Sequence, residues 1–80
     1  MKIPVIKKMA EQFNMAELEK AEAAFYDEKQ PDIDIPGEDE GEQLTHVMAA
    51  LEIQREIRDT GCEFNTALRN YTQRVRNSIS

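Results

Sequence analysis

The chain has 80 residues, 16 of them acidic and 10 basic, so its formal net charge is −6. A chain of this length forms one small domain, residues 1–80, and often needs a partner chain to bury enough surface. The single cysteine excludes an intrachain disulfide, and there is no clustered Cys/His set for a structural zinc site. No apolar run is long enough to span a membrane, and the charged start lacks a signal-peptide core, so we expect a soluble cytoplasmic protein.

Helical periodicity predicts two helices in the first half of the chain. The first covers about 4–13 and begins near Pro4; it must bury its apolar face, because ten residues are too few to remain helical alone. Asn14 is a predicted N-cap for a second helix over about 15–28, and Glu17 completes a capping box. The two predicted apolar faces contain Val5, Ile6, Met9, Ala10 and Phe13, and then Met15, Leu18, Ala21 and Phe25.

An acidic segment rich in proline and glycine, residues 29–39, follows the second helix and cannot continue it. We expect an extended loop that Ile33 and Ile35 hold to the core.

The same segment partly resembles a calcium-binding EF-hand loop. Asp32, Asp34 and Gly37 fall at the first, third and sixth positions of that loop. Pro36 at the fifth position and Gln43 at the twelfth do not fit. We therefore interpret the segment as a solvated acidic loop, and we expect no metal and no other cofactor.

A third predicted helix, over about 40–60, carries two apolar stripes on nearly opposite sides. The stripes are Leu44, Val47, Met48 and Leu51, and His46, Ala50, Ile53 and Ile57. Two stripes indicate burial on both sides, inside the chain or against a second copy. We expect a homodimer whose interface includes Ala50, Ile53 and Ile57.

Gly61 is expected to end the third helix, and a fourth helix over about 63–77 returns to a single apolar stripe. This stripe contains Phe64, Ala67, Leu68, Tyr71 and Val75. The predicted fold class is all-α: a small four-helix arrangement of two helical hairpins joined by the acidic loop.

Three features could carry chemistry. His46 is the only histidine, and Glu42 one turn before it could pair with the ring, but no orienting third group is evident, so we interpret His46 as structural. Cys62 lies near the start of the fourth helix, where its thiol has Glu63 beside it, and we expect an ordinary reduced thiol. No nucleophile–base pair and no glycine-rich phosphate loop is present, so we expect no enzyme activity.

The third and fourth helices, with Gly61 between them, could also form a DNA-binding helix-turn-helix. Residues of the last helix that could contact DNA are Asn65, Thr66, Arg69, Asn70, Gln73 and Arg76. Residues 1–10 and 64–80 each sum to +3, but residues 11–63 sum to −12. Because this acidic middle would repel DNA, nucleic acid is an unfavourable partner, and we expect binding to another protein, not yet identified, instead.

The opening residues 1–7, Met-Lys-Ile-Pro-Val-Ile-Lys, resemble those of a family of short bacterial all-helical proteins of unknown function. Gly41-Glu42 at the entry to the third helix, Arg74-Val75 and Ser78-Ile79 carry the same resemblance. None of these motifs is catalytic. The resemblance also implies an accessory role in thiol redox physiology, in which Cys62 would be the reactive group.

Overall fold

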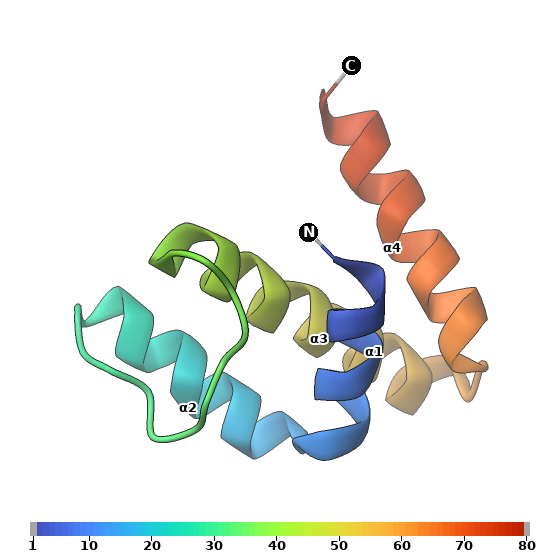
Figure 1. Ribbon diagram of the computed structural model, residues 1–80. Helices are drawn as coiled ribbons and strands as arrows, with labels where there is room; N and C mark the ends of the chain where they lie inside the picture. Colours follow the sequence, from blue (N-terminus) through green and yellow to red (C-terminus); the bar gives the residue numbers. More distant parts are fainter. Residues whose placement is uncertain (1, 80) are drawn as a thin grey trace.

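The computed structural model describes residues 2–79, with side chains described for residues 2–77. This part of the chain forms four α-helices and contains no strand: α1 (Ile3–Gln12), α2 (Met15–Tyr26), α3 (Glu40–Thr60) and α4 (Phe64–Ile79) (Figure 1). The all-α prediction is confirmed, and each helix begins and ends within two residues of its predicted position.

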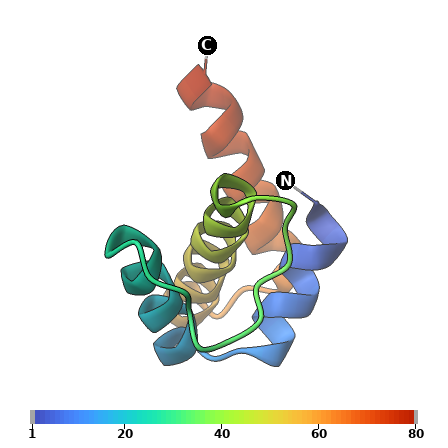
Figure 2. The ribbon, with the colours of Figure 1, turned by 60° about the vertical axis from the view of Figure 1, so that its left-hand side comes forward.

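The long helix α3 is the centre of the fold. α1, α2 and α4 each pack against α3 and make little contact with one another (Figures 1 and 2). The predicted hairpin of α3 and α4 is therefore present, whereas α1 and α2 meet chiefly through α3.

Two contacts along each of α1 and α2 fix the direction of that helix relative to α3. The backbone of Lys2 contacts His46, while the carbonyl oxygen of Phe13 contacts Gln54, so α1 runs in the same direction as α3. In α2, Glu19 lies 3.8 Å from Arg55, and the Met15 sulfur accepts a hydrogen bond from Arg58, so α2 runs in the opposite direction.

Local sequence signals account for the helix ends. The side chain of Asn14 accepts a hydrogen bond from the Glu17 backbone N–H at 2.8 Å, and the Glu17 carboxylate accepts one from the Asn14 N–H at 3.1 Å. The predicted capping box is thus confirmed. Asp39 caps α3 in a similar way, and Gly61 ends it with φ of 71°, a left-handed conformation that glycine adopts without steric cost.

The acidic loop leaves α2, crosses towards α1 and returns to the start of α3 (Figure 2). Ile35 is buried and Ile33 is half-buried, which confirms that the two isoleucines anchor the loop. Gln43 of α3 donates a hydrogen bond to the Ile35 carbonyl oxygen at 2.8 Å. Gly37 is required here, because its φ is 152° and an added Cβ would come within 2.7 Å of the Gln43 side chain.

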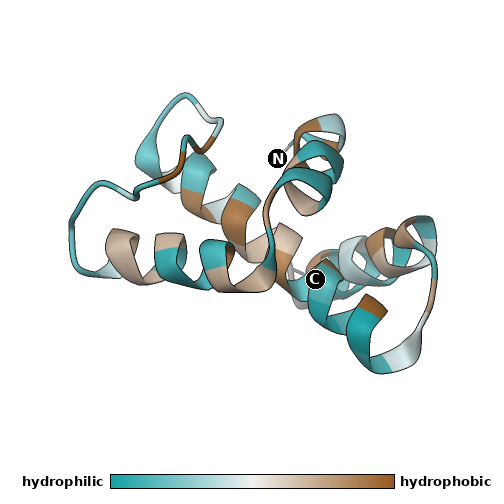
Figure 3. Ribbon diagram, turned by 90° about the horizontal axis from the view of Figure 1, so that it is seen from below, coloured by the Kyte–Doolittle hydropathy of each residue, from teal (hydrophilic) through white to brown (hydrophobic). Residues whose placement is uncertain are grey.

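α3 contributes more residues to the hydrophobic core than any other element, and the other helices and the loop supply the rest. Hydrophilic and hydrophobic stretches alternate along the helices, as expected for amphipathic helices that share one core (Figure 3). The buried apolar residues are Ile6, Met9, Leu18, Ala21, Ile35, Val47, Ala49, Ala50, Leu51, Ile53 and Ala67. Across residues 2–79, no helix has both the length and the apolar character that a bilayer crossing requires.

Candidate functional site

The predicted homodimer interface on α3 lies inside the single chain. Ala50 and Ile53 are fully buried, and Ile57 is partly buried. Ala50 lies one turn from both His46 and Gln54, and each of those residues binds an end of α1. The second apolar stripe is therefore covered by the chain's own α1. This corrects the expected interface, because a second copy could reach Ala50 or Ile53 only if α1 left α3.

His46 is a buried residue with both ring nitrogens in use. Nδ1 lies 2.9 Å from the carbonyl oxygen of Pro36, and Nε2 lies 3.2 Å from the backbone nitrogen of Lys2. A carbonyl only accepts and an amide N–H only donates, so the proton must be on Nδ1. The ring nitrogens bind these backbone groups and not Glu42. His46 therefore joins the acidic loop and the start of α1 to α3, and neither nitrogen is free for proton transfer or metal binding.

Two carboxylates of the acidic loop have structural partners. Asp32 lies 3.4 Å from the Lys20 ammonium, in an exposed ion pair between the loop and α2. Asp39 accepts the hydrogen bond that caps α3. Over residues 2–79, no three histidine, cysteine, aspartate or glutamate side chains come together as metal ligands.

Cys62 lies in the short connection between α3 and α4 and is half-buried as a free thiol. Its backbone N–H donates a hydrogen bond to the Thr60 hydroxyl at 3.3 Å. The side chain packs against the edge of the hydrophobic core, as the thiol of a structural cysteine does.

The surface proposed for DNA contact on α4 borders carboxylates of α3. All six candidate residues are exposed. However, Asn70 donates a hydrogen bond to Glu56 at 2.9 Å, and Arg74 lies within 3.8 Å of both Glu52 and Glu56. These carboxylates border α4 on the side that faces α3 and weaken the positive potential around this helix, so the local charge is unfavourable for that partner.

The same contacts define which side of α4 faces α3. Asn70 and Arg74 lie one turn apart and bind α3, and Ala67 on the same side is fully buried. Burial against α3 is the main cause that raises the pKa of Tyr71; the nearby Glu52 raises it further and Arg74 lowers it. Tyr71 therefore marks the edge of the covered side of α4.

The rest of the apolar stripe on α4 is incompletely covered. Leu68 and Val75 are only half-buried, and they lie two turns apart on one side of the helix. Part of Leu68 packs against the edge of the core. Val75 lies one turn beyond Tyr71 and about 40° around the helix from it, so it stands at the edge of the side that faces α3. Figure 1 shows α4 extending beyond the other helices, with its C-terminal end away from the body. Helical spacing in the sequence identified this stripe. The spacing did not reveal that α3 would be the main helix covering it.

The fold and its exposed stripe define a small all-α domain built on one central helix, with a terminal helix that is covered on one side. The whole chain, residues 1–80, matches the model of a family of unknown function, DUF6952, and the protein belongs to that family. No curated protein and no solved structure matches the chain. Family membership agrees with the resemblance found in the sequence and supplies no activity to transfer.

Proposed function

We propose that this protein is not an enzyme and acts by binding another protein chain through α4. The observation that carries the proposal is the partly exposed stripe of Leu68 and Val75 on a helix whose main packing is against α3. Half-buried aliphatic side chains on a projecting helix keep part of their apolar surface in water. A second chain that covered them would gain the free energy of burying that surface. Helix faces of this kind are a common contact surface between proteins.

The state of the histidine and the cysteine supports a binding role over catalysis. His46 uses both ring nitrogens to hold backbone groups, and Cys62 lies against the core edge. A lone thiol without a partner in the chain fits the reducing cytoplasm, where we expect the protein to act. We expect a homodimer among its assemblies, beside a partner protein of another kind.

Site-specific photo-crosslinking in the native cell tests this proposal. A photoreactive phenylalanine analogue would replace Val75 in one variant and Gln73 in the control variant. Gln73 is exposed and lies on nearly the opposite side of α4, so the two probes sample the apolar and polar faces of one helix. We expect protein crosslinks from position 75 and few from position 73. Equal yields at the two positions, or none at either, would contradict the role of the apolar side.

A further inference from the structure

A second partly apolar surface lies on the other flank of α3. Tyr26, at the end of α2, is 63% exposed, and Met48 of α3 is 41% exposed. Both values are high for such large side chains in a chain whose other apolar residues mostly pack against the core.

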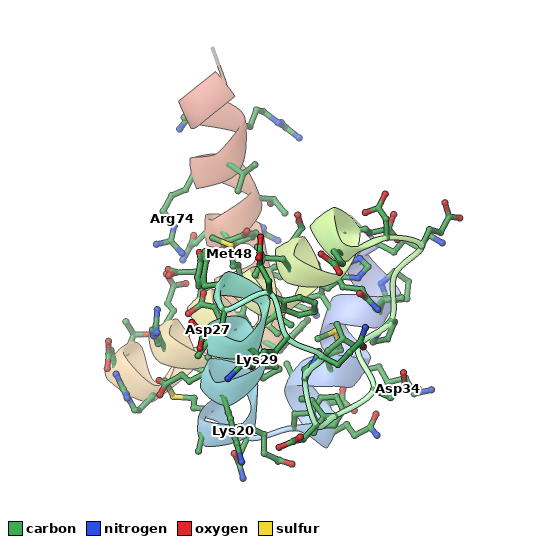
Figure 4. All side chains as sticks on the ribbon, turned by 90° about the vertical axis from the view of Figure 1, so that its left-hand side faces the viewer. Lys20, Asp27, Lys29, Asp34, Met48 and Arg74 are labelled. Atoms are coloured by element: carbon green, nitrogen blue, oxygen red, sulfur yellow. The ribbon has the colours of Figure 1, made fainter. Side chains whose placement is uncertain are left out.

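The pairing of α2 with α3 places Tyr26 beside Met48. The two helices run in opposite directions, and Glu19 lies opposite Arg55. Seven residues are close to two helical turns, so they preserve the side of a helix. Two turns forward from Glu19 lead to Tyr26, and two turns back from Arg55 lead to Met48. Seen from the left-hand side of Figure 1, Met48 lies between the end of α2 and Arg74 of α4 (Figure 4).

The same register adds carboxylates to this surface. One turn from Tyr26 along α2 is Glu22, and one turn from Met48 along α3 is Glu52. We call these four residues, Glu22, Tyr26, Met48 and Glu52, the α2–α3 patch. Glu52 shares Arg55 with Glu19 and also lies 3.8 Å from Arg74 of α4, whereas Glu22 has no ion pair among residues 2–77. The patch is therefore apolar at its centre and acidic at its edge.

The exposed side of α4 has the opposite charge. Arg69 and Arg76 follow Leu68 and Val75 directly in the sequence, are exposed, and have no ion pair in the described part of the chain. Residues 64–80 sum to +3, while residues 1–63 sum to −9. Within one chain, Arg74 of α4 lies 3.8 Å from Glu52 at one edge of the patch, but α4 makes little contact with its own α2. Glu22 and Tyr26 on the α2 side of the patch therefore remain open to a second chain.

We infer that the partner of α4 is a second copy of this chain, whose α2–α3 patch receives Leu68 and Val75 while Arg69 lies near Glu22. This inference rests on the proposed function and names the partner. In a two-fold dimer the contact forms twice, because each α4 binds the patch of the other chain. Complementary charge at the edge of an apolar contact selects the partner and orients it.

A pair of charge reversals tests the contact. Arg69→Glu gives α4 a negative charge against an acidic patch, and Glu22→Arg gives the patch a positive charge against a basic α4. Each variant alone should dimerise roughly tenfold more weakly than the wild type. An equimolar mixture of the two variants should regain dimers. In the mixed dimer, the introduced glutamate of one chain meets the introduced arginine of the other at one contact, and both native residues meet at the second contact.

Sedimentation velocity over a wide concentration range measures the dimer fraction of the wild type, of each variant and of the equimolar mixture, all as the full chain. Circular dichroism melting identifies a variant that fails to fold, and Arg76→Glu, two turns along α4, then replaces Arg69→Glu. Recovery of dimers only in the mixture supports the inference. Variants that dimerise like the wild type, or a mixture no stronger than its components, would overturn it. A wild type that is monomeric throughout also overturns it, whereas crosslinks from position 75 to a different protein would leave the proposed function intact.

Discussion

Nδ1 of the buried His46 donates a hydrogen bond to the carbonyl oxygen of Pro36 at 2.9 Å, so a side chain of the central helix holds the middle of the acidic loop. The other ring nitrogen accepts from the Lys2 backbone N–H. One imidazole thus connects three segments that are far apart in the sequence.

Replacing this ring by an apolar side chain of similar size should destabilise the fold. We expect His46→Leu to lower the free energy of unfolding by about 2–4 kcal/mol, because the Pro36 carbonyl and the Lys2 N–H both lose their partner. Chemical denaturation measures the loss. Hydrogen exchange should show faster exchange at the start of α1 and in the loop.

Lys8→Leu is the control, since it introduces the same side chain at an exposed position of α1 outside the α2–α3 patch. We expect this change to alter stability by no more than about 0.5 kcal/mol. Equal stability of the two variants would show that the hydrogen bonds of His46 contribute nothing measurable.

Just after α2, the backbone conformation of Glu28 costs free energy that a glycine at this position would not pay. Glu28 has φ of 59°, which is unfavourable for a residue with a Cβ atom. Glu28→Gly should therefore raise the free energy of unfolding by about 0.5–1 kcal/mol. Ala23→Gly, in the middle of exposed helical turns nearby, should lower it by about 1 kcal/mol. Thermal melting of the two variants tests the predicted gain in stability for Glu28→Gly and the predicted loss for Ala23→Gly. A loss of stability in both would contradict the left-handed conformation at Glu28.

Tyr71 should show a pH dependence of stability in the alkaline range. Burial on α3, aided by Glu52, raises its folded-state pKa above the ordinary 10.0. The unfolded chain then releases the tyrosine proton first, so this stabilising contribution is complete below about pH 10 and is lost as pH rises towards the folded pKa.

Ultraviolet absorbance titration of Tyr26→Phe, in which Tyr71 is the sole tyrosine, measures this pKa directly. We expect Glu52→Gln to move it downwards, because the neighbouring negative charge is removed. A Tyr71 that titrates at or below its ordinary pKa would contradict its packing against α3.

The secondary structure of this chain could be predicted because its signals are local. The capping box of Asn14 and Glu17, the terminal Gly61 and the anchoring Ile35 depend on neighbouring residues or simple periodicity, and the structure contains all of them. The stripes of α3 were also recognisable from helical spacing alone.

The coverage of each stripe could not be predicted, because it depends on how distant helices pack. α1 covers Ala50 through contacts that α3 makes with backbone groups of Lys2 and Phe13. Backbone donors and acceptors occur at nearly every residue, so the sequence does not reveal which ones His46 and Gln54 will bind. Without that information, a stripe buried within the chain and a stripe at an interface between chains show the same spacing of apolar residues in the sequence.

The central claim is that the second apolar stripe of α3 is buried within the chain, whereas the stripe of α4 binds another chain. One substitution in each stripe tests this claim most directly. Sedimentation velocity and circular dichroism melting would be measured on Ile53→Asp and Val75→Asp. We predict that Ile53→Asp unfolds at lower temperature, because it places a carboxylate in the core, while Val75→Asp keeps its melting behaviour and loses association. A stably folded Ile53→Asp that no longer associates, together with an unchanged Val75→Asp, would contradict the account.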